Sequence, residues 1–203
     1  MLRFKEYNRE QGFTLIELLI AMALALIIIG ALSSAFVSQR KSYAVQEQVS
    51  DMIQGARAAM DMISREVKMA GFDPKRAGIV GIPYSATQLQ IVADKKVEDG
   101  AIDATSEENI IYSYDSASFQ IDRNIGSGNQ PLAENIQGFT FTYWDENGTE
   151  ITSSAQQVDI RVIKIEIETK TAEPDPIYTH PTYGDGYRRY KLTSYVTPPN
   201  LDL

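Results

Sequence analysis

With 203 residues, a formal net charge of −8 at pH 7 and no cysteine, the chain has the length of one ordinary globular domain plus an additional segment. The lack of cysteine excludes disulfides, thiolate catalysis and cysteine-ligated metals, and an acidic balance without a clustered basic face argues against nucleic-acid binding. Since the one histidine, His180, lies among proline, tyrosine and threonine, we expect no histidine triad, metal site, cofactor or enzyme activity.

A short polar segment precedes a long apolar one at the start of the chain. Residues 1–12 are polar, whereas residues 13–37 contain one charged side chain, Glu17. As a helix the apolar segment is about 37 Å long at ~1.5 Å per residue, enough to span a hydrocarbon layer of ~30 Å. A cleaved secretory signal would be shorter. A plain membrane anchor leaves Glu17 unexplained, because a carboxylate inside a spanning helix costs about 2.5–3.5 kcal/mol.

The residues around Glu17 form a specific pattern, Gly12-Phe13-Thr14-Leu15-Ile16-Glu17. This pattern, followed by an apolar helix, resembles the signal of type IV prepilins and of type II secretion pseudopilins. The resemblance implies that a prepilin peptidase removes residues 1–12 by cutting between Gly12 and Phe13, and then methylates the new amine of Phe13. It also implies that Glu17 pairs with the amine of a neighbouring subunit and sets the register of assembly.

The charges of the leader predict an orientation in the membrane. Arg3, Lys5 and Arg9 favour a cytoplasmic N-terminus, although Arg40 and Lys41 on the other side weaken this argument. The resemblance to prepilins implies a single-pass protein of the inner membrane with its head in the periplasm, which later enters a pilus at the cell surface.

The helix is expected to continue beyond the apolar segment, as an amphipathic helix over residues 38–70. Apolar residues at spacings of three and four form one stripe that predicts packing on the chain's own sheet rather than a free coiled coil. Gly71 and Pro74 are stop signals, so we expect a helix from about Phe13 to Ala70. The stripe residues are Val49, Ile53, Ala56, Met60, Ile63, Val67 and Ala70.

The remaining residues, 71–203, predict a β-rich head. Short runs of β-forming residues separated by turn signals indicate strands at 88–93, 109–115, 118–123, 139–144, 158–169 and 187–196. The segment 145–148 ends in Asn-Gly and is interpreted as a turn rather than a calcium loop, because Gln156 replaces the glutamate of an EF-hand.

Two further features of the head predict an irregular strand and an exposed loop. The apolar phase changes at Val162–Ile163 and suggests either a bulge in the strand 158–169 or a strand that crosses between two environments. The polar, acidic segment 94–108 is expected to be mobile surface. A helix followed by an antiparallel sheet predicts an α+β fold with the sheet on the helix stripe, and the N-terminal signal makes the expected fold type IV pilin-like.

Within the head, segments 66–74, 119–123, 131–136 and 143–148 resemble PilW-type minor pilins, and J-type pseudopilins share this layout. The resemblance implies a minor pilin that helps to initiate pilus assembly, with the pilus tip as one place for it. Its implied partners are prepilin peptidase, other minor pilins, the major pilin, the inner-membrane assembly platform and membrane lipid, with no nucleic acid.

Two other functions stay open at this point. One is a minor pseudopilin of type II secretion, which has the same helix and processing. The other is an adhesin-type binding head, for which an aromatic patch would be the surface. The candidate aromatic residues are Tyr178, Tyr183, Tyr187, Tyr190 and Tyr195.

Overall fold

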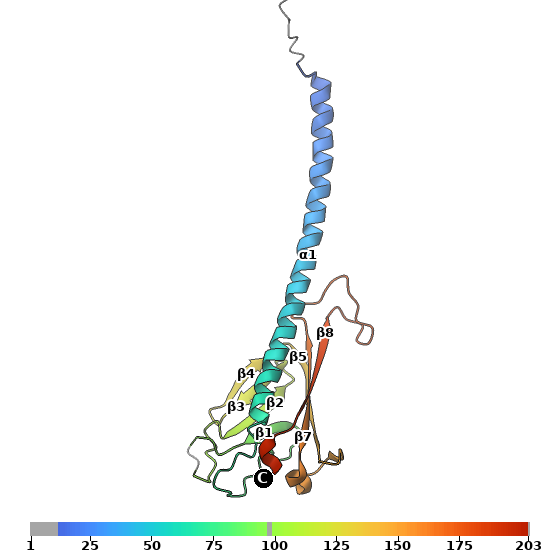
Figure 1. Cartoon of the computed structure of the whole chain (residues 1–203). Coiled ribbons are helices and arrows are strands. Elements are labelled where there is room, and N and C mark those ends of the chain that lie inside the picture. Colours follow the sequence, from blue (N-terminus) through green and yellow to red (C-terminus); the bar gives the residue numbers. More distant parts are fainter. Residues whose placement is uncertain (1–11, 97–98, 203) are drawn as a thin grey trace, which may run out of the picture. The chain divides into compact units, whose positions relative to one another are not determined.

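The computed structural model describes residues 12–96 and 99–202, so the predicted leader lies outside the described residues except for Gly12. The chain divides after Gln46 into two compact units, which we call unit 1 and unit 2. Figure 1 shows the order of the elements along the chain. One long helix, α1 (Leu15–Val67), begins in unit 1 and ends in unit 2.

Unit 1 is the first part of α1, and its described residues bury almost nothing. The side chains from Leu15 to Val37 are all exposed, and of residues 12–46 only Val45 is half-buried. A helix that is apolar on all sides requires an apolar environment around it. Among the described residues, α1 alone has the length and composition to cross a membrane.

In the described part of unit 2, the strands form two four-stranded antiparallel sheets rather than one. The first has the order β1-β2-β3-β4, with a register shift between Ile121 and Asp122. Its strands are β1 (Gln88–Val92), β2 (Asn109–Asp115), β3 (Gln120–Asn124) and β4 (Asn129–Ala133). The second has the order β6-β5-β7-β8. Its strands are β5 (Ile136–Trp144), β6 (Glu150–Ile151), β7 (Val162–Lys170) and β8 (Arg189–Val196).

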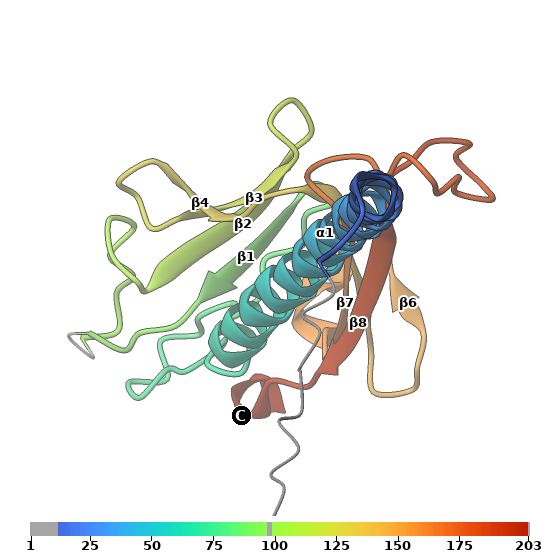
Figure 2. The ribbon, with the colours of Figure 1, turned by 90° about the horizontal axis from the view of Figure 1, so that it is seen from above.

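The core of unit 2 lies between the second part of α1 and the two sheets. Viewed along α1 in Figure 2, the sheet β1–β4 lies on one side of the helix and β7 and β8 lie on the other. Burying an isoleucine or leucine contributes about 1.5–3 kcal/mol, so this shared core is the main force that joins the layers. Fully buried members are Ile63, Val67, Leu89, Ile110, Ile121, Ile136, Ile163, Ile165 and Ile167.

The end of α1 is set by close backbone packing at two glycines. The helix stops at Val67 and continues as a turn to Gly71, which has a φ of 78°. The amide of Gly71 donates to the carbonyl of Val92 at 2.9 Å. A Cβ on Gly81 would lie 2.2 Å from the nitrogen of Gly71, so a side chain at position 81 would push the helix end away from the strand.

The predicted strand 158–169 is wrong in its first part. Residues Ser154–Asp159 form a 3-10 helix, η1, and β7 begins only at Val162. Val158 is 63% exposed, whereas Ile160 is buried. The apolar phase changes because the chain leaves a helical turn there and enters a strand. The register shift between β5 and β7 lies elsewhere, between Ile136 and Gly138.

The expectation that the segment 94–108 is a surface loop is also wrong at its two ends. Asp94 and Glu108 are both buried. The Asp94 carboxylate accepts a hydrogen bond from the amide of Gly100, and Glu108 accepts from the amides of Lys96 and Asp103, all at 2.8 Å. Buried acids therefore hold this loop through its backbone amides.

Candidate functional site

The N-terminal signal is placed at the exposed start of α1. Gly12 and Phe13 precede the helix, and Phe13 is 92% exposed. Thr14 donates from its amide (2.9 Å) and its hydroxyl (2.8 Å) to Oε2 of Glu17. In return, the amide of Glu17 donates to Thr14 Oγ1 at 3.3 Å. This is a reciprocal capping box at the helix N-terminus.

The capping box gives Glu17 a role that the sequence analysis missed. Its carboxylate satisfies amide donors that would otherwise have no partner, and its charge lies at the positive end of the helix dipole. Oε1 of Glu17 accepts no hydrogen bond from any described residue. The spacing Thr-x-x-Glu was the signal that could have revealed the cap.

The stripe residues on α1 fall into two groups in unit 2. Val49 and Ile53 are half-buried. The helix also buries Met52 and Ala59, which flank the stripe and widen it. The remaining stripe residues are buried, namely Ala56, Met60, Ile63, Val67 and Ala70.

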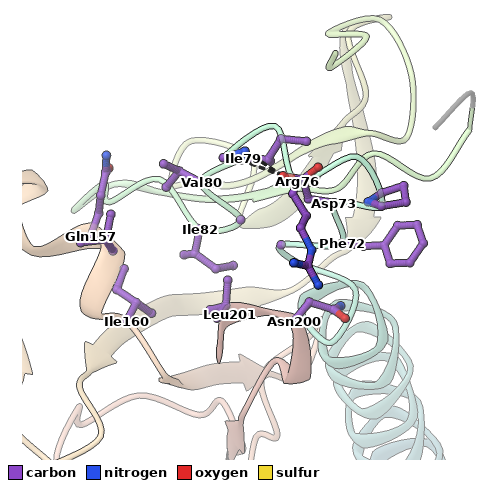
Figure 3. A pocket seen from close by; sticks show the side chains of 15 residues that line it. Phe72, Asp73, Arg76, Ile79, Val80, Ile82, Gln157, Ile160, Asn200 and Leu201 are labelled. Carbon is purple, nitrogen blue, oxygen red and sulfur yellow. Dashed lines mark hydrogen bonds between the residues drawn. The ribbon is translucent and has the colours of Figure 1, made fainter. Parts of the chain in front are cut away.

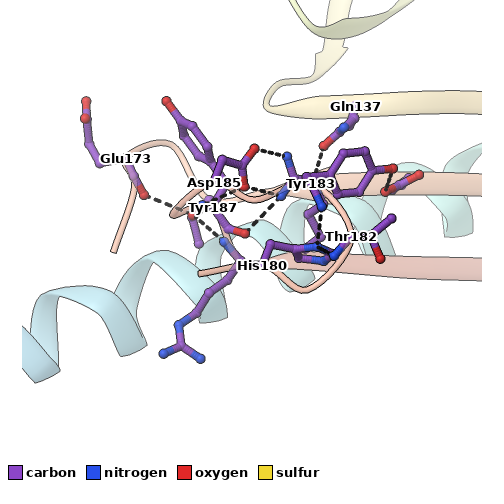
Figure 4. A network of polar contacts seen from close by, with 11 residues as sticks. Gln137, Glu173, His180, Thr182, Tyr183, Asp185 and Tyr187 are labelled. Atoms are coloured by element: carbon purple, nitrogen blue, oxygen red, sulfur yellow. Dashed lines mark hydrogen bonds and ion pairs between the residues drawn. The ribbon is translucent and has the colours of Figure 1, made fainter. Parts of the chain in front are cut away.

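The loop 171–188 between β7 and β8 is held by hydrogen bonds, part of which Figure 4 shows, and by two ion pairs. Arg188 binds Asp175 from Nε at 3.0 Å and from Nη2 at 2.8 Å. Arg189 binds Asp185 with contacts of 2.7 and 2.6 Å. Hydrogen bonds from Arg189 lower the pKa of Asp185 to about 2.

His180 has a local structural role in this loop. Its Nδ1 accepts hydrogen bonds from the amides of Thr182 (3.2 Å) and Tyr183 (3.3 Å). The guanidinium of Arg189 lies 3.9 Å from the centre of the Tyr183 ring. Among the described residues, no group of three or more histidine, aspartate or glutamate side chains is arranged to hold a metal ion.

The five candidate tyrosines do not form one surface. Tyr178, Tyr183 and Tyr187 lie in or beside the loop network. Tyr190 and Tyr195 are both on β8, five positions apart, and successive residues of a strand point to opposite faces. Tyr190 is half-buried, whereas Tyr195 is 66% exposed.

A cavity of about 550 Å³ lies where α1 ends in unit 2 (Figure 3). Three separate segments line it: the turn after α1 from 71 to 82, η1 with Ile160, and the C-terminal residues Asn200 and Leu201. Its size lies within the range of ordinary ligand pockets. No contiguous motif marks it, so the sequence analysis did not find it.

The comparisons with known proteins address the N-terminal segment most directly. The family model of the prokaryotic N-terminal methylation motif matches residues 7–33. A solved structure of a type IV-like pilin from Thermus thermophilus is similar over 74% of this chain and 98% of that chain, with 12% identity and a TM-score of 0.48. A search of curated protein sequences found no match.

The methylation motif covers the glycine, the phenylalanine and the glutamate described above. The apolar first part of α1 is consistent with membrane anchoring. This motif, followed by a long α-helix and antiparallel β-sheets, supports a type IV pilin-like protein.

Proposed function

We propose that the chain is a minor pilin of a type IV pilus, which helps to initiate pilus assembly and is placed at or near the tip. The observation that carries this proposal is the methylation motif at the start of a helix whose first part, from Leu15 to Val37, is apolar and exposed. Prepilin peptidase is the processing enzyme, and other minor pilins, the major pilin and the inner-membrane assembly platform are the partners.

The proposed cleavage between Gly12 and Phe13 creates a charge that needs a partner. The new amine of Phe13 is positive, and an unpaired charge in an apolar environment is very unfavourable. Glu17 has one carboxylate oxygen engaged by Thr14 and the other without a hydrogen bond from the described residues. The second oxygen can accept the methylated amine of a neighbouring subunit and thereby set the register.

In this proposal, residues 13–37 lie in two different environments, one before and one after assembly. Before assembly they span the inner membrane, with residues 71–203 forming the head in the periplasm. In the pilus they pack with other apolar helices, while residues 38–70 join them to the head. Both environments are apolar, so the exposed surface of the helix suits both.

A structural role is favoured over catalysis. Pilin-like proteins are typically structural. In the described part of the chain, Asp175 and Asp185 of the loop network are engaged by arginines, and the buried Asp94 and Glu108 accept hydrogen bonds from backbone amides. The proposal therefore assigns the head to contacts with other proteins.

The test is a count of surface pili on cells that lack the gene, with the export of secreted enzymes measured in the same strain. We expect few or no pili and normal secretion, both restored by the wild-type gene on a plasmid. Normal pili with blocked secretion would contradict the proposal and identify a minor pseudopilin of type II secretion instead.

A further inference from the structure

We infer that unit 2 carries a head-to-tail contact site, in which two different surfaces of the same chain fit each other. Ile177 of one copy enters the 550 Å³ cavity of a second copy, and Arg76 of the second copy pairs with the carboxylate of Glu173 of the first. The inference goes beyond the proposed function, because it concerns contacts between copies of this chain and needs neither a pilus nor a secretion system.

The cavity has an apolar side and a cationic side. In Figure 3, Val80, Ile82 and Ile160 line one side, and the guanidinium of Arg76 points towards Asn200 on the other. Leu201 lies between them. An apolar side chain next to a carboxylate matches this arrangement.

Arg76 lacks an acidic partner within the described residues. The acidic residue of the cavity lining, Asp73, accepts hydrogen bonds from the amides of Ala77, Gly78 and Ile79. These bonds shape the loop and leave the guanidinium unpaired. In a chain with a net charge of −8, a free cation beside an apolar cavity favours an acidic partner surface.

The chain itself presents the matching side chain on loop 171–188. Ile177 is 90% exposed, more than any other large apolar residue in the described part of unit 2. A single exposed apolar residue is ordinary on a protein surface, but this one belongs to a loop whose backbone is held in place. Its amide donates to Asp175 Oδ1 at 3.1 Å, and the buried Asp175 is bound by Arg188. A loop backbone that is ordered in advance loses less entropy on binding.

An acidic side chain belongs to the same loop. Glu173 is exposed and forms no ion pair with a described residue. Its backbone amide is fixed by a hydrogen bond of 3.0 Å to Gln48 Oε1 on α1. The loop therefore offers both an apolar side chain for the apolar side of the cavity and a carboxylate for its cationic side.

The two surfaces lie at opposite ends of unit 2. The cavity is lined by residues just before β7, whereas loop 171–188 follows β7 directly. β7 has 9 residues, which separates the ends by about 30 Å at ~3.3 Å per residue. One copy therefore cannot fill its own cavity, and the same contact repeated between copies joins them head to tail in a ring or an open array.

Because the sequence contains no cysteine, a disulfide between two introduced cysteines tests the contact directly. Two differently tagged full-length copies are purified in detergent, so that no membrane fixes their relative depth, and mixed under oxidising conditions, one with Thr179→Cys beside Ile177 and one with Val158→Cys at the cavity. A disulfide needs Cα atoms within about 7 Å. We expect a mixed disulfide dimer of the two tags, and none when Val158→Cys is paired with Ser116→Cys on the β2–β3 turn.

Variants then test the chemistry of the contact. Ile177→Asp should lower cross-linking about tenfold or more, whereas Ile177→Leu should retain it. Arg76→Glu should lower it about two- to fivefold, and adding Glu173→Arg should restore it. No mixed dimer with the wild-type loop, or equal cross-linking by Ile177→Asp, would overturn the inference. This readout is independent of pilus counts, so the inference and the proposed function can fail separately.

Discussion

Glu66 near the end of α1 forms an ion pair with Arg123 on β3, with Oε1 2.8 Å from Nη2. Nε of Arg123 also donates to the same carboxylate, at 3.2 and 3.3 Å. The hydroxyl of Tyr112 on β2 donates to Oε2. Burial raises the pKa of Tyr112, so this hydroxyl keeps its proton and remains a donor. The group therefore fastens the helix to the first sheet.

Removing the acid should destabilise unit 2. Glu66→Ala leaves the Arg123 cation and the Tyr112 hydroxyl without their acceptor, which should lower the free energy of unfolding by roughly 2–4 kcal/mol. The measurement is denaturant unfolding of the full chain in detergent, followed by the fluorescence of Trp144, the one tryptophan. Arg57→Ala, an exposed change on the same helix, should stay within about 0.5 kcal/mol. Equal effects of the two variants would contradict the prediction.

The boundary between η1 and β7 predicts unequal effects for two apolar residues. Ile160 is buried, so Ile160→Ala should cost about 2–5 kcal/mol through lost burial and a cavity. Val158 is 63% exposed, so Val158→Ala should change the free energy of unfolding by less than about 0.5 kcal/mol. The same unfolding measurement compares them. If residues 158–169 were one strand with both side chains inward, both variants would be strongly destabilised.

The elements that could be predicted are those with a strong local signal. The spacing of apolar residues indicated α1 to within a few residues, and β2 has the predicted bounds, Asn109–Asp115. Alternation cannot tell which strands pair, so the division into two sheets was not predictable. Nor could composition reveal that Asp94 and Glu108 are buried, since their partners are backbone amides that any sequence offers.

The same distinction applies to the candidate sites. The segment from Gly12 to Glu17 is contiguous, and its chemistry depends on neighbouring residues, so it could be recognised directly. The cavity is assembled from Ile82, Ile160 and Leu201, which are distant in sequence and are brought together only by the fold. Likewise, the exposure of Ile177 depends on ion pairs that close its loop.

Acid should loosen loop 171–188. Hydrogen bonds from Arg188 lower the pKa of Asp175, and those from Arg189 lower the pKa of Asp185 to about 2. A carboxyl whose pKa is lower in the folded state stabilises that state fully above its unfolded pKa of about 3.9. That stabilisation is lost progressively as the pH falls below about 4 towards the lowered pKa of each folded carboxyl, which for Asp185 is about 2.

Amide hydrogen exchange of the peptide 171–188, corrected for the intrinsic effect of pH on exchange, measures this change. Protection should fall between pH 4 and pH 2, and Asp185→Asn should lower it already at pH 6. Asp51→Asn is the control, because Asp51 makes no ion pair with a described residue. A wild-type loop that keeps its protection at pH 2 would show that these pairs do not hold it.

Processing and assembly should be separable at the N-terminus. Gly12→Leu places a bulky side chain at the proposed cleavage site and should leave the precursor uncut, visible as a heavier protein by intact mass. Glu17→Ala should still be cut and methylated, since the site itself is unchanged, but should be missing from sheared pili. The reason is that the methylated amine of a neighbour would have no carboxylate to pair with in the apolar helix bundle.

Thr14→Val separates the two roles of Glu17. This variant removes the hydroxyl that donates to Oε2 but keeps the carboxylate. Loss of a cap contact costs about 0.5–2 kcal/mol, so incorporation into pili should fall only partly if pairing with the amine is the main role of Glu17. If Thr14→Val is as deficient as Glu17→Ala, the carboxylate acts chiefly as a helix cap. Normal incorporation of Glu17→Ala would exclude both roles in assembly.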